Sequence, residues 1–396
     1  MSTGNGSRRR FAVAFAIAAC SVGVAACGSD DSSSSSATAS GSSASKTSND
    51  PGLARAKQLV EKNSKLATNF KPPGPPIKGA KAAMDGKTVW YIPITYAPAF
   101  FVGEAKTIGD ALSHVGAKLH VCDGKANPSA ITSCMTQAAN SGAGGVITDA
   151  IPVQLAEQGY RLLATKKVPT VASQLNLPIP TDGAFATYLA RNEGNEISAQ
   201  ALGAANIIVH SNGKAKVLMF IATDSPSAKL ASQSAVNEVK KDCPACELKT
   251  FEGVNTSPKV GTAFSSALLA DPNAEYIYSP YEAPTGELQL QGIKQTGRKV
   301  TVVMSAGDPA GLKRVAEGTQ LSDSGTDPVA MGWNAVDTLL RLTTGMPPTN
   351  IKTNIRLFTK DNVPTDLSDK ARDTGEWYSD MSYKPMYTKL WTGSDG

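Results

Sequence analysis

The sequence predicts an α/β protein built from two doubly wound parallel-sheet lobes. From residue 87 onward, runs rich in Val and Ile alternate with segments of helical period. These runs carry apolar residues on both faces, as the strands of a parallel sheet covered on both sides do. The alternation comprises about fifteen elements, more than one sheet comfortably holds, so a chain of 396 residues divides naturally into two lobes.

The overall composition indicates a globular, nearly neutral protein. Hydrophobic residues make up 41% and charged residues 18%, enough apolar material for a sizeable core. The formal charge of +5 comes in part from an N-terminal Arg8-Arg9-Arg10 run, so we expect no nucleic acid or other polyanionic partner. With three His, the chain offers little for metal binding or histidine-base catalysis.

Residues 1–26 have the features of an export signal. The Arg8-Arg9-Arg10 run precedes an almost unbroken stretch of apolar and small residues that ends at Ala26. Val24-Ala25-Ala26-Cys27 resembles a bacterial lipobox, which predicts lipidation of Cys27 and a lipid anchor to the cell membrane. Cys20 fits the same pattern loosely, and an ordinary secretory signal is the remaining alternative.

Three segments then lead into the globular part. The Ser-rich stretch 27–50 is predicted to be a disordered tether, because it cannot bury apolar surface. Within 51–85, residues 53–66 have helical spacing, and a Pro-rich run at 71–76 indicates a stiff spacer. The globular part is expected to begin near Gly86.

The alternation predicts strands and helices in regular succession. In the first half, strands are expected at 88–95, 117–122, 145–148 and 168–172, with helices at 101–115, 129–140 and 153–166. In the second half, helices are expected at 197–209, 228–240, 259–270 and 288–296, with strands at 216–221, 248–251, 276–278 and 300–304.

Five short segments occur in a suggestive order along this alternation. They are Pro98-Ala99-Phe100-Phe101, Lys167-Val168-Pro169-Thr170-Val171, Leu269-Ala270-Asp271-Pro272-Asn273, Gly307-Asp308-Pro309 and Asp327-Pro328-Val329-Ala330-Met331-Gly332. In this order and spacing, they resemble the type I periplasmic solute-binding proteins of ABC importers, especially the ribose- and galactose-binding group. The resemblance covers Lys87 to about Lys360.

The resemblance implies a three-stranded hinge between the lobes. In that family the chain crosses between lobes three times, which places the crossings here near 189–192, 325–327 and 349–352. The N-lobe would then comprise 86–190 with 327–350, including a helix at 327–346. The C-lobe would comprise 191–326 with 351–396, so the C-terminal tail is expected to pack on that lobe.

The resemblance also implies a ligand site between the lobes, on the loops that follow the strands. Aromatic faces and hydrogen-bonding groups there suit a small polar ligand such as a sugar. The candidate ligand-binding residues are Tyr96, Phe100, Phe101, Asp149, Gln174, Asp224, Tyr281, Glu282, Asp308 and Thr326. Phe101 has an alternative role as the first core residue of its helix, and Asp224 as a helix N-cap.

Several family residues are replaced in this chain. Gln174-Leu175 stands where sugar-binding relatives have Asp-Arg, Tyr281-Glu282 replaces Asn-Asp, Thr326 replaces Gln, and 228–233 lacks the relatives' Arg. The loss of a bidentate guanidinium removes a strong partner for vicinal hydroxyls. A larger, less hydroxylated or aromatic solute is therefore an alternative to a pentose or hexose.

Four cysteines remain after the signal and lipobox, an even number that suits an oxidising compartment. Three pairings are possible, and Cys122–Cys134 with Cys243–Cys246 demands least because each pair is close in sequence. A redox role for Cys243 and Cys246 would require a helix N-terminus, whereas this motif follows a predicted helix.

No catalytic or metal-binding motif fits. Ser211-Asn212-Gly213-Lys214 matches Ser-x-x-Lys but is a turn signal before a strand, and the glycines at 142–145 precede a strand. No His or Cys pair has zinc-ligand spacing. We therefore expect no enzyme, no cofactor and no metal.

The sequence as a whole predicts an extracytoplasmic, monomeric solute receptor. It would deliver a small polar ligand, a sugar or sugar-like compound, to the permease subunits of an ABC transporter by hinge closure. The alternative is a sensory receptor that presents its ligand to a membrane kinase or chemoreceptor.

Overall fold

The computed structural model describes residues 50–68, 70–71, 73–349 and 351–393. Asn49–Gly396 form one compact unit. The predicted signal peptide, nearly all of the predicted tether, Cys20 and Cys27 lie outside the described residues. Within the described residues, no helix is both long and apolar enough to cross a bilayer.

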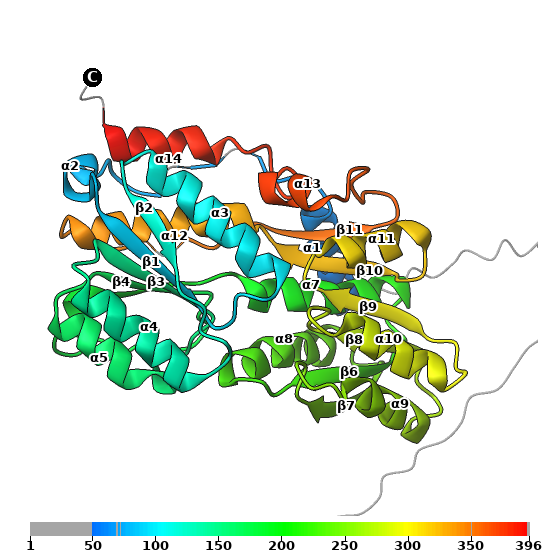
Figure 1. Cartoon of the computed structure of the whole chain (residues 1–396). Coiled ribbons are helices and arrows are strands. Elements are labelled where there is room, and N and C mark those ends of the chain that lie inside the picture. The colour runs from blue at the N-terminus through cyan, green and yellow to red at the C-terminus, as the bar shows by residue number, and fades with distance from the viewer. Residues whose placement is uncertain (1–49, 69, 72, 350, 394–396) are drawn as a thin grey trace, which may run out of the picture. The chain divides into compact units, whose positions relative to one another are not determined.

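The first lobe is built on a parallel sheet, whose five strands in the described residues have the order β2-β1-β3-β4-β5 (Figure 1). Every pair of neighbours in this sheet is parallel. Its strands are β1 (Thr88–Pro93), β2 (Lys118–Val121), β3 (Gly145–Asp149), β4 (Thr170–Ser173) and β5 (Leu189–Asn192).

The second lobe is built on a sheet with the order β11-β10-β9-β8-β6-β7. The edge strand β11 runs antiparallel to β10, and the other pairs are parallel. Its strands are β6 (Lys216–Ala222), β7 (Glu247–Gly253), β8 (Tyr276–Ser279), β9 (Thr301–Ser305), β10 (Ser322–Thr326) and β11 (Ile355–Thr359).

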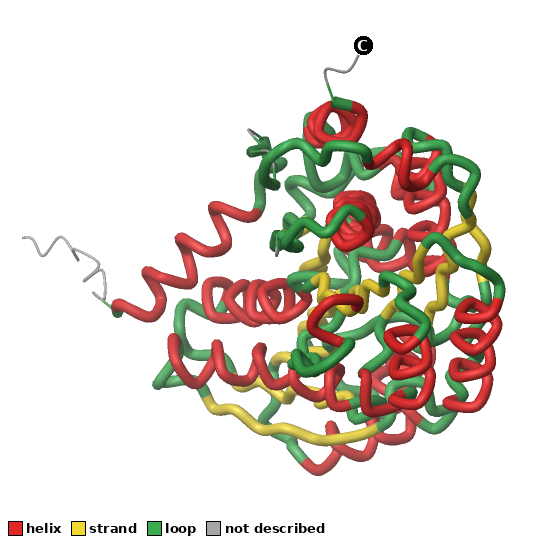
Figure 2. Tube along the Cα trace, turned by 90° about the vertical axis from the view of Figure 1, so that its left-hand side faces the viewer, coloured by secondary structure: helices red, strands yellow, loops and turns green. Residues whose placement is uncertain are grey.

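Helices cover both faces of each sheet (Figure 2). In chain order they are α1 (Pro51–Asn63), α2 (Ala80–Met84), α3 (Ala99–Ser113), α4 (Pro128–Asn140), α5 (Glu157–Thr165), α6 (Phe185–Tyr188), α7 (Glu196–His210), α8 (Pro226–Asp242), α9 (Val260–Ala270), α10 (Gly286–Gln295), α11 (Pro309–Glu317), α12 (Pro328–Thr343), α13 (Asp369–Thr374) and α14 (Tyr383–Thr392). A short 3-10 turn at Val153–Leu155 precedes α5.

The strand pattern explains the layers. In β1, Val89 and Tyr91 pack toward α3 and α12, whereas Trp90 and Ile92 pack toward α4 and α5. The strands of the second lobe alternate in the same way between a core with α7 and α8 and a core with α9 and α10. Successive side chains of a strand point to opposite faces, so apolar residues at every position require helices on both sides.

The predicted doubly wound α/β fold is confirmed. The predicted strands and helices are found with ends within three residues of those expected, except that 153–166 splits into the 3-10 turn and α5. Both predicted disulfides are present, with Cα–Cα distances of 5.9 Å for Cys122–Cys134 and 5.3 Å for Cys243–Cys246.

The chain passes between the two sheets at three places near those expected. It leaves the first sheet after β5 and enters the second lobe at α7, returns after β10 to α12, and passes back from α12 to β11. A buried amide pair lies at the first passage, where Asn334 Nδ2 donates to Asn192 Oδ1 at 2.7 Å.

Both terminal segments differ from expectation. The segment 51–85 is not a spacer outside the globular part: α1 packs on α7 and α8 through Leu53 and Ala56, and Ile77 is buried in the first lobe. The C-terminal helix α14 packs on α12 of the first lobe, with Trp391 stacked on Trp333. Only part of the tail, including β11, belongs to the second lobe, because aromatic side chains of α14 complete the first lobe's core.

Candidate functional site

The carboxyl ends of the first sheet's strands meet at one edge. Pro93 pairs with Asp149, Asp149 with Ser173, and Ser173 with Asn192. The loops after β1, β3 and β4 therefore leave the sheet side by side. The first-lobe candidates lie at this edge: Asp149 ends β3, Tyr96 and Gln174 lie in the loops, and Phe100 and Phe101 lie in the first turn of α3.

The aromatic candidates after β1 have two different environments. Tyr96 packs on the core of the first lobe, and its backbone N–H donates to the Asp123 carboxylate at 2.8 Å. Phe100 and Phe101, in the first turn of α3, meet edge to face with ring centroids 5.4 Å apart. Both rings are partly exposed, and neither belongs to the core clusters of the described residues. The alternative role of Phe101 as a core residue is therefore wrong.

Asp149 lies in a buried polar network beneath this edge. Tyr91 donates to Asp149 Oδ2 at 2.6 Å, and Gln174 Nε2 donates to Glu104 Oε2 at 3.1 Å. Burial, reinforced by the Asp149 charge, raises the pKa of Glu104 well above its usual range. Gln174 thus contacts Glu104, a residue that the sequence pattern did not single out.

In the second lobe, Asp224 joins two loops. Its carboxylate accepts from the backbone N–H groups of Asn255 at 2.7 Å and Thr256 at 2.9 Å. The N-cap of α8 is Ser225, whose hydroxyl accepts from the Ala228 N–H, so the predicted capping role of Asp224 is wrong. Asp224 instead ties the loop after β6 to the loop after β7.

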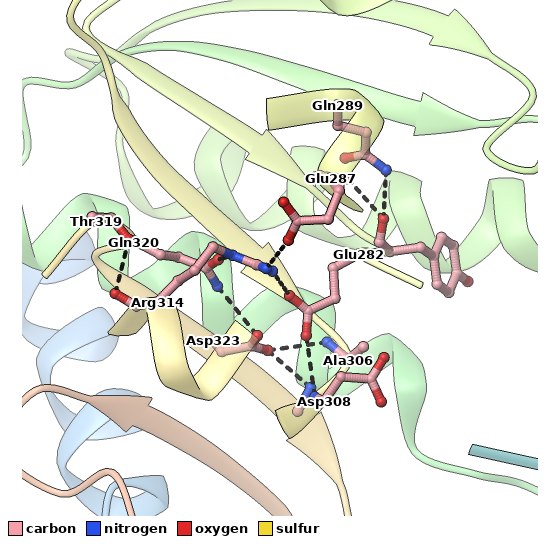
Figure 3. A network of polar contacts seen from close by, with 12 residues as sticks. Glu282, Glu287, Gln289, Ala306, Asp308, Arg314, Thr319, Gln320 and Asp323 are labelled. Atoms are coloured by element: carbon pink, nitrogen blue, oxygen red, sulfur yellow. Dashed lines mark hydrogen bonds and ion pairs between the residues drawn. The ribbon is translucent and has the colours of Figure 1, made fainter. Parts of the chain in front are cut away.

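Glu282 is directed into its own lobe (Figure 3). Its side chain is 3% exposed, Oε2 accepts from Arg314 Nη2 at 2.5 Å, and Oε1 accepts from the backbone N–H of Asp308 at 3.1 Å. Asp323 completes this network, because its Oδ1 accepts from the N–H groups of Ala306 at 3.0 Å and Gly307 at 2.9 Å. Glu282 and Asp323 thus hold the loop that follows β9.

Asp308 is presented by this loop. It occupies the N-cap position of α11, yet its carboxylate makes no capping hydrogen bond. Figure 3 shows the carboxylate pointing away from the network that holds its backbone. Among the described residues it has no hydrogen-bond partner for its side chain, which leaves its oxygens free to accept from a ligand. Burial raises the pKa of Asp308, and Arg372 acts against this shift.

The remaining candidates lie close to these loops. Tyr281 is partly buried at the edge of the second lobe's core. Thr326 is buried at the end of β10 and pairs with Ile355 of β11, next to the second passage between the sheets. Among the described residues, neither side chain forms a hydrogen bond with the network around Glu282.

The sequence pattern missed Glu196, which begins α7. Its carboxylate accepts from Asn176 Nδ2 of the first lobe at 3.2 Å, so it joins the loop after β4 to the second lobe. Burial, together with the Asp149 charge, raises the pKa of Glu196 to about 7. The Glu196 charge in turn acts on Tyr281. A Glu in the first turn of a helix is common and does not by itself indicate a ligand site. In the sequence, only the position of Glu196 next to a predicted crossing between the lobes could have singled it out.

Two surface hollows lie elsewhere on the molecule. One is lined by Lys216, Arg298 and Thr301 at the amino ends of β6 and β9, and the other by His114, Trp333 and Lys384. Neither includes a residue of the loops described above. In the described part of the chain, no group of three or more His, Cys, Asp or Glu residues is placed to hold a metal ion.

Comparisons with known proteins agree with this arrangement. The family model described as the periplasmic binding protein domain matches residues 89–347. The comparison with curated proteins found no significant match. Members of the matching family are binding proteins of the extracytoplasmic space rather than enzymes.

Several solved structures share the fold. GanP, a glucose-galactose binding protein from Geobacillus stearothermophilus, has a TM-score of 0.63 at 16% identity over 71% of this chain and 99% of its own. An ABC transporter solute-binding protein from Agrobacterium vitis, bound with alpha-D-tagatopyranose, has a TM-score of 0.62 at 17% identity over 72% and 98%.

A carbohydrate transporter protein from Acidothermus cellulolyticus, in complex with myo-inositol, has a TM-score of 0.59 at 18% identity over 73% of this chain and 99% of its own. At these identities the likeness is one of fold. Together with the family model, which spans well over half of the sequence, it confirms the resemblance found in the sequence. The chain belongs to the periplasmic binding protein domain family and has the type I fold of the solute-binding proteins of ABC transporters.

Proposed function

We propose that this protein is the solute receptor of an ABC importer and that it binds a sugar or sugar-like compound between its two lobes. The proposal depends on one observation: near the carboxyl ends of the strands, aromatic rings and a carboxylate are not taken up by the core or by hydrogen bonds. The Phe100–Phe101 pair lies outside the hydrophobic core, and the Asp308 carboxylate has no hydrogen-bond partner among the described residues. Apolar sugar faces stack on aromatic rings, and sugar hydroxyls donate to carboxylates.

Ligands of proteins with this fold support the same class. Solved structures that share the fold are complexes with alpha-D-tagatopyranose, allitol, myo-inositol, D-arabinose and D-allose. These compounds share several hydroxyls on a small carbon skeleton. Larger or aromatic solutes remain a second class of candidate ligand. At 175 and 228–233, where sugar-binding relatives have Arg, this chain has no guanidinium to bind vicinal hydroxyls.

Binding would act through closure of the lobes. Phe100 and Phe101 belong to the first lobe and Asp308 to the second, so a ligand that contacts both sides stabilises the closed form over the open one. Permease subunits would then recognise the closed form. The mature chain would be a monomer attached to the membrane by lipid on Cys27.

A thermal-shift screen tests this function. The panel contains D-tagatose, allitol, myo-inositol, D-arabinose and D-allose, with nucleosides and aromatic acids as the second class. A compound at 100 times its Kd should stabilise the protein by about 2.7 kcal/mol. Shifts with nucleosides or aromatic acids and none with sugars or polyols would overturn the sugar assignment.

Two variants locate the site. Asp308→Ala should abolish the shift while leaving the melting temperature without ligand close to that of the wild type, because the Asp308 side chain makes no hydrogen bond to the part of the chain that the structure describes. Asp361→Ala removes an exposed carboxylate beyond the far end of β11 and should leave the shift unchanged. An unchanged shift in Asp308→Ala would remove Asp308 from the site.

The alternative role is sensory, in which the closed receptor engages a membrane kinase or chemoreceptor. Pull-down with the loaded receptor distinguishes the two, because an importer should retain permease subunits. Lipidation is tested separately: Cys27→Ser should abolish incorporation of labelled palmitate, whereas Cys20→Ser should not.

A further inference from the structure

The segment that follows β11 and carries the short helix α13 contacts both lobes (Figure 1). On the second-lobe side it reaches the loop after β9. A Cβ atom at Gly307 or at Gly325 would overlap the Tyr378 hydroxyl, so this side chain lies directly against the residue that precedes Asp308. The C-terminal segment therefore contacts one of the predicted ligand loops.

The same segment is anchored to the second lobe. Ala371 of α13 packs on a cluster that contains Leu312 of α11 and Phe358 of β11. Trp377 belongs to this cluster, and its carbonyl oxygen accepts from Nη1 of Arg356 in β11. Packing and hydrogen bonding thus make α13 a part of the second lobe, and we expect it to move with that lobe.

On the first-lobe side, α13 meets the start of α3. Lys106 Nζ lies 2.8 Å from Asp373 Oδ2, and the two side chains form an ion pair. A Cβ atom at Gly103 would lie 2.7 Å from Asp373 Oδ1, closer than real Cβ atoms approach their neighbours, so glycine leaves room for this carboxylate. Phe100 and Phe101 lie about one turn earlier in the same helix. The contact is therefore on the side of the first lobe where the ligand loops leave the sheet.

Asp373 is held in place by its own helix. Its Oδ1 accepts from Arg372 Nε at 3.0 Å and Nη2 at 2.7 Å, and Arg372 Nη1 donates to Asp369 Oδ1 at 3.1 Å. The Asp373 side chain is 15% exposed, whereas that of Lys106 is 62% exposed. Because the carboxylate is fixed on α13 and the ammonium group belongs to α3, the ion pair depends on the relative position of the two lobes.

We propose that Lys106 and Asp373 form a latch that joins the ligand-bearing ends of the two lobes and strengthens ligand binding without touching the ligand. Contacts between the lobes on the ligand side break when the lobes separate, so the latch favours the closed form. Both are positioning residues, because they act through the position of α3 relative to the second lobe. The inference rests on the proposed function for its ligand, but the latch itself can be tested without one.

The effect of the latch should be modest and sensitive to salt. An exposed ion pair changes an equilibrium by about fivefold at most. A ligand that binds the closed form loses affinity in proportion to the fraction of protein that is closed. Salt screens exposed charges, with a Debye length of about 10 Å at about 0.1 M and about 3 Å at about 1 M. Breaking the latch by substitution or by salt should therefore weaken binding in the same direction.

The first experiment measures the separation of the lobes without ligand. Spin labels are attached through Gln154→Cys after β3 and Leu230→Cys in α8, two exposed positions near the carboxyl edges of the sheets. Pulsed electron resonance gives the distribution of distances between the labels. Lys106→Glu, which places two carboxylates side by side, should shift it to longer distances, and Lys106→Arg should keep it. A distribution that Lys106→Glu leaves unchanged, or shifts to shorter distances, overturns the proposal.

The second experiment measures affinity by titration calorimetry for the five uncharged sugars and polyols of the thermal-shift panel. At about 0.1 M salt, Lys106→Glu should weaken binding about fivefold and Lys106→Arg should keep the wild-type affinity. At about 1 M salt, the wild type should weaken toward Lys106→Glu. Because these ligands carry no charge, a salt effect that is lost in Lys106→Glu comes from the protein pair. Equal affinities of the wild type and Lys106→Glu at the lower salt concentration overturn the latch.

Two further variants separate the latch from general effects of charge. Gly103→Ala keeps every charge but displaces Asp373, so it should change the distances and the affinity in the same direction as Lys106→Glu. Lys249→Glu is the matched control, because Lys249 is 59% exposed and pairs with Asp271 at 2.7 Å within the second lobe. It should match the wild type in both measurements. A Lys249→Glu protein that behaves like Lys106→Glu would assign the effect to surface charge in general and overturn the latch.

The latch and the proposed function fail differently. If none of the five compounds binds the wild type, the sugar-binding function fails, and the label distances still decide the latch. If the compounds bind the wild type, Lys106→Glu and Gly103→Ala equally well and the distances do not change, the function stands and the latch is overturned.

Discussion

Tyr91 donates a hydrogen bond to Asp149, with 2.6 Å between the Tyr91 hydroxyl and Asp149 Oδ2, and both side chains are fully buried. The bond links the middle of β1 to the carboxyl end of β3. It therefore orients a carboxyl group at the edge of the sheet where the ligand loops leave.

Replacing Tyr91 by Phe should loosen Asp149 without creating a large cavity. The lost hydrogen bond leaves a buried carboxyl atom unsatisfied, at a cost of about 1–3 kcal/mol of unfolding free energy, measured by urea unfolding. Ligand affinity should fall as well. The control is Tyr276→Phe, which removes a hydroxyl bonded to His210 at 2.8 Å at the start of β8. Equal ligand affinities in the two variants would contradict a role for Tyr91 at the site.

Asp327 makes the stability of the protein depend on pH. It is fully buried and caps α12, accepting at 3.0 Å from the N–H groups of both Val329 and Ala330. Burial raises its pKa to about 7 from an ordinary value of 3.8. Between these values the native state holds a proton that the unfolded chain has lost, so the unfolding free energy falls as the pH rises. Above about pH 7 this contribution is gone.

Asp327→Asn should therefore flatten the pH dependence. The amide oxygen can still cap α12, but the side chain no longer titrates. Each pH unit between 4 and 7 should cost the variant less stability than the wild type, by at most about 1.4 kcal/mol per unit. Glu196 and Asp323, with pKa values raised to about 7 and about 6, keep part of the slope. Urea unfolding at pH 5, 6 and 7 measures it, and identical slopes would contradict this account.

Gly52 permits α1 to dock on the second lobe. A Cβ atom there would overlap the backbone of Asp242 at the end of α8. Gly52→Ala should release α1, with faster amide hydrogen exchange at Leu53 and Ala56 and unchanged exchange in β6. Gln58→Ala, on the exposed face of the same helix, should leave the exchange of α1 unchanged. Protection of α1 that survives Gly52→Ala would show that the helix docks in some other way.

The alternation of strands and helices was predictable, because a strand that is buried on both faces has apolar residues at successive positions, and this pattern is local in the sequence. The orientation of Glu282 was not, because its partner Arg314 lies 32 residues away and the sequence does not say which loop it reaches. The docking of α1 was missed for a similar reason. Its apolar face suggests a partner, but the residues that it meets, such as Asp242 of α8 against Gly52 and Arg55, lie far away in the sequence.

Trp391 anchors the C-terminal helix to the first lobe. It is 1% exposed, stacks on Trp333 with centroids 5.2 Å apart, and its Nε1 donates to Asp337 Oδ1 at 2.9 Å. Trp391→Ala should cost about 3–5 kcal/mol, as large-to-small changes of buried aromatic residues do. Thr392→Ala, at an exposed neighbouring position, should cost little. Calorimetry measures both, and similar melting temperatures for the two variants would place α14 outside the cooperative core.

The two disulfides should contribute unequally to stability. Cys122 and Cys134 are separated by 12 residues, and Cys243 and Cys246 by 3. The entropy of closing these loops in the unfolded chain corresponds to about 3 kcal/mol for the longer loop and about 2 kcal/mol for the shorter one. Cys122→Ser combined with Cys134→Ser should therefore lower the urea midpoint more than the corresponding change at 243 and 246. The reverse order would mean that native packing around the second pair, rather than loop length, sets its contribution.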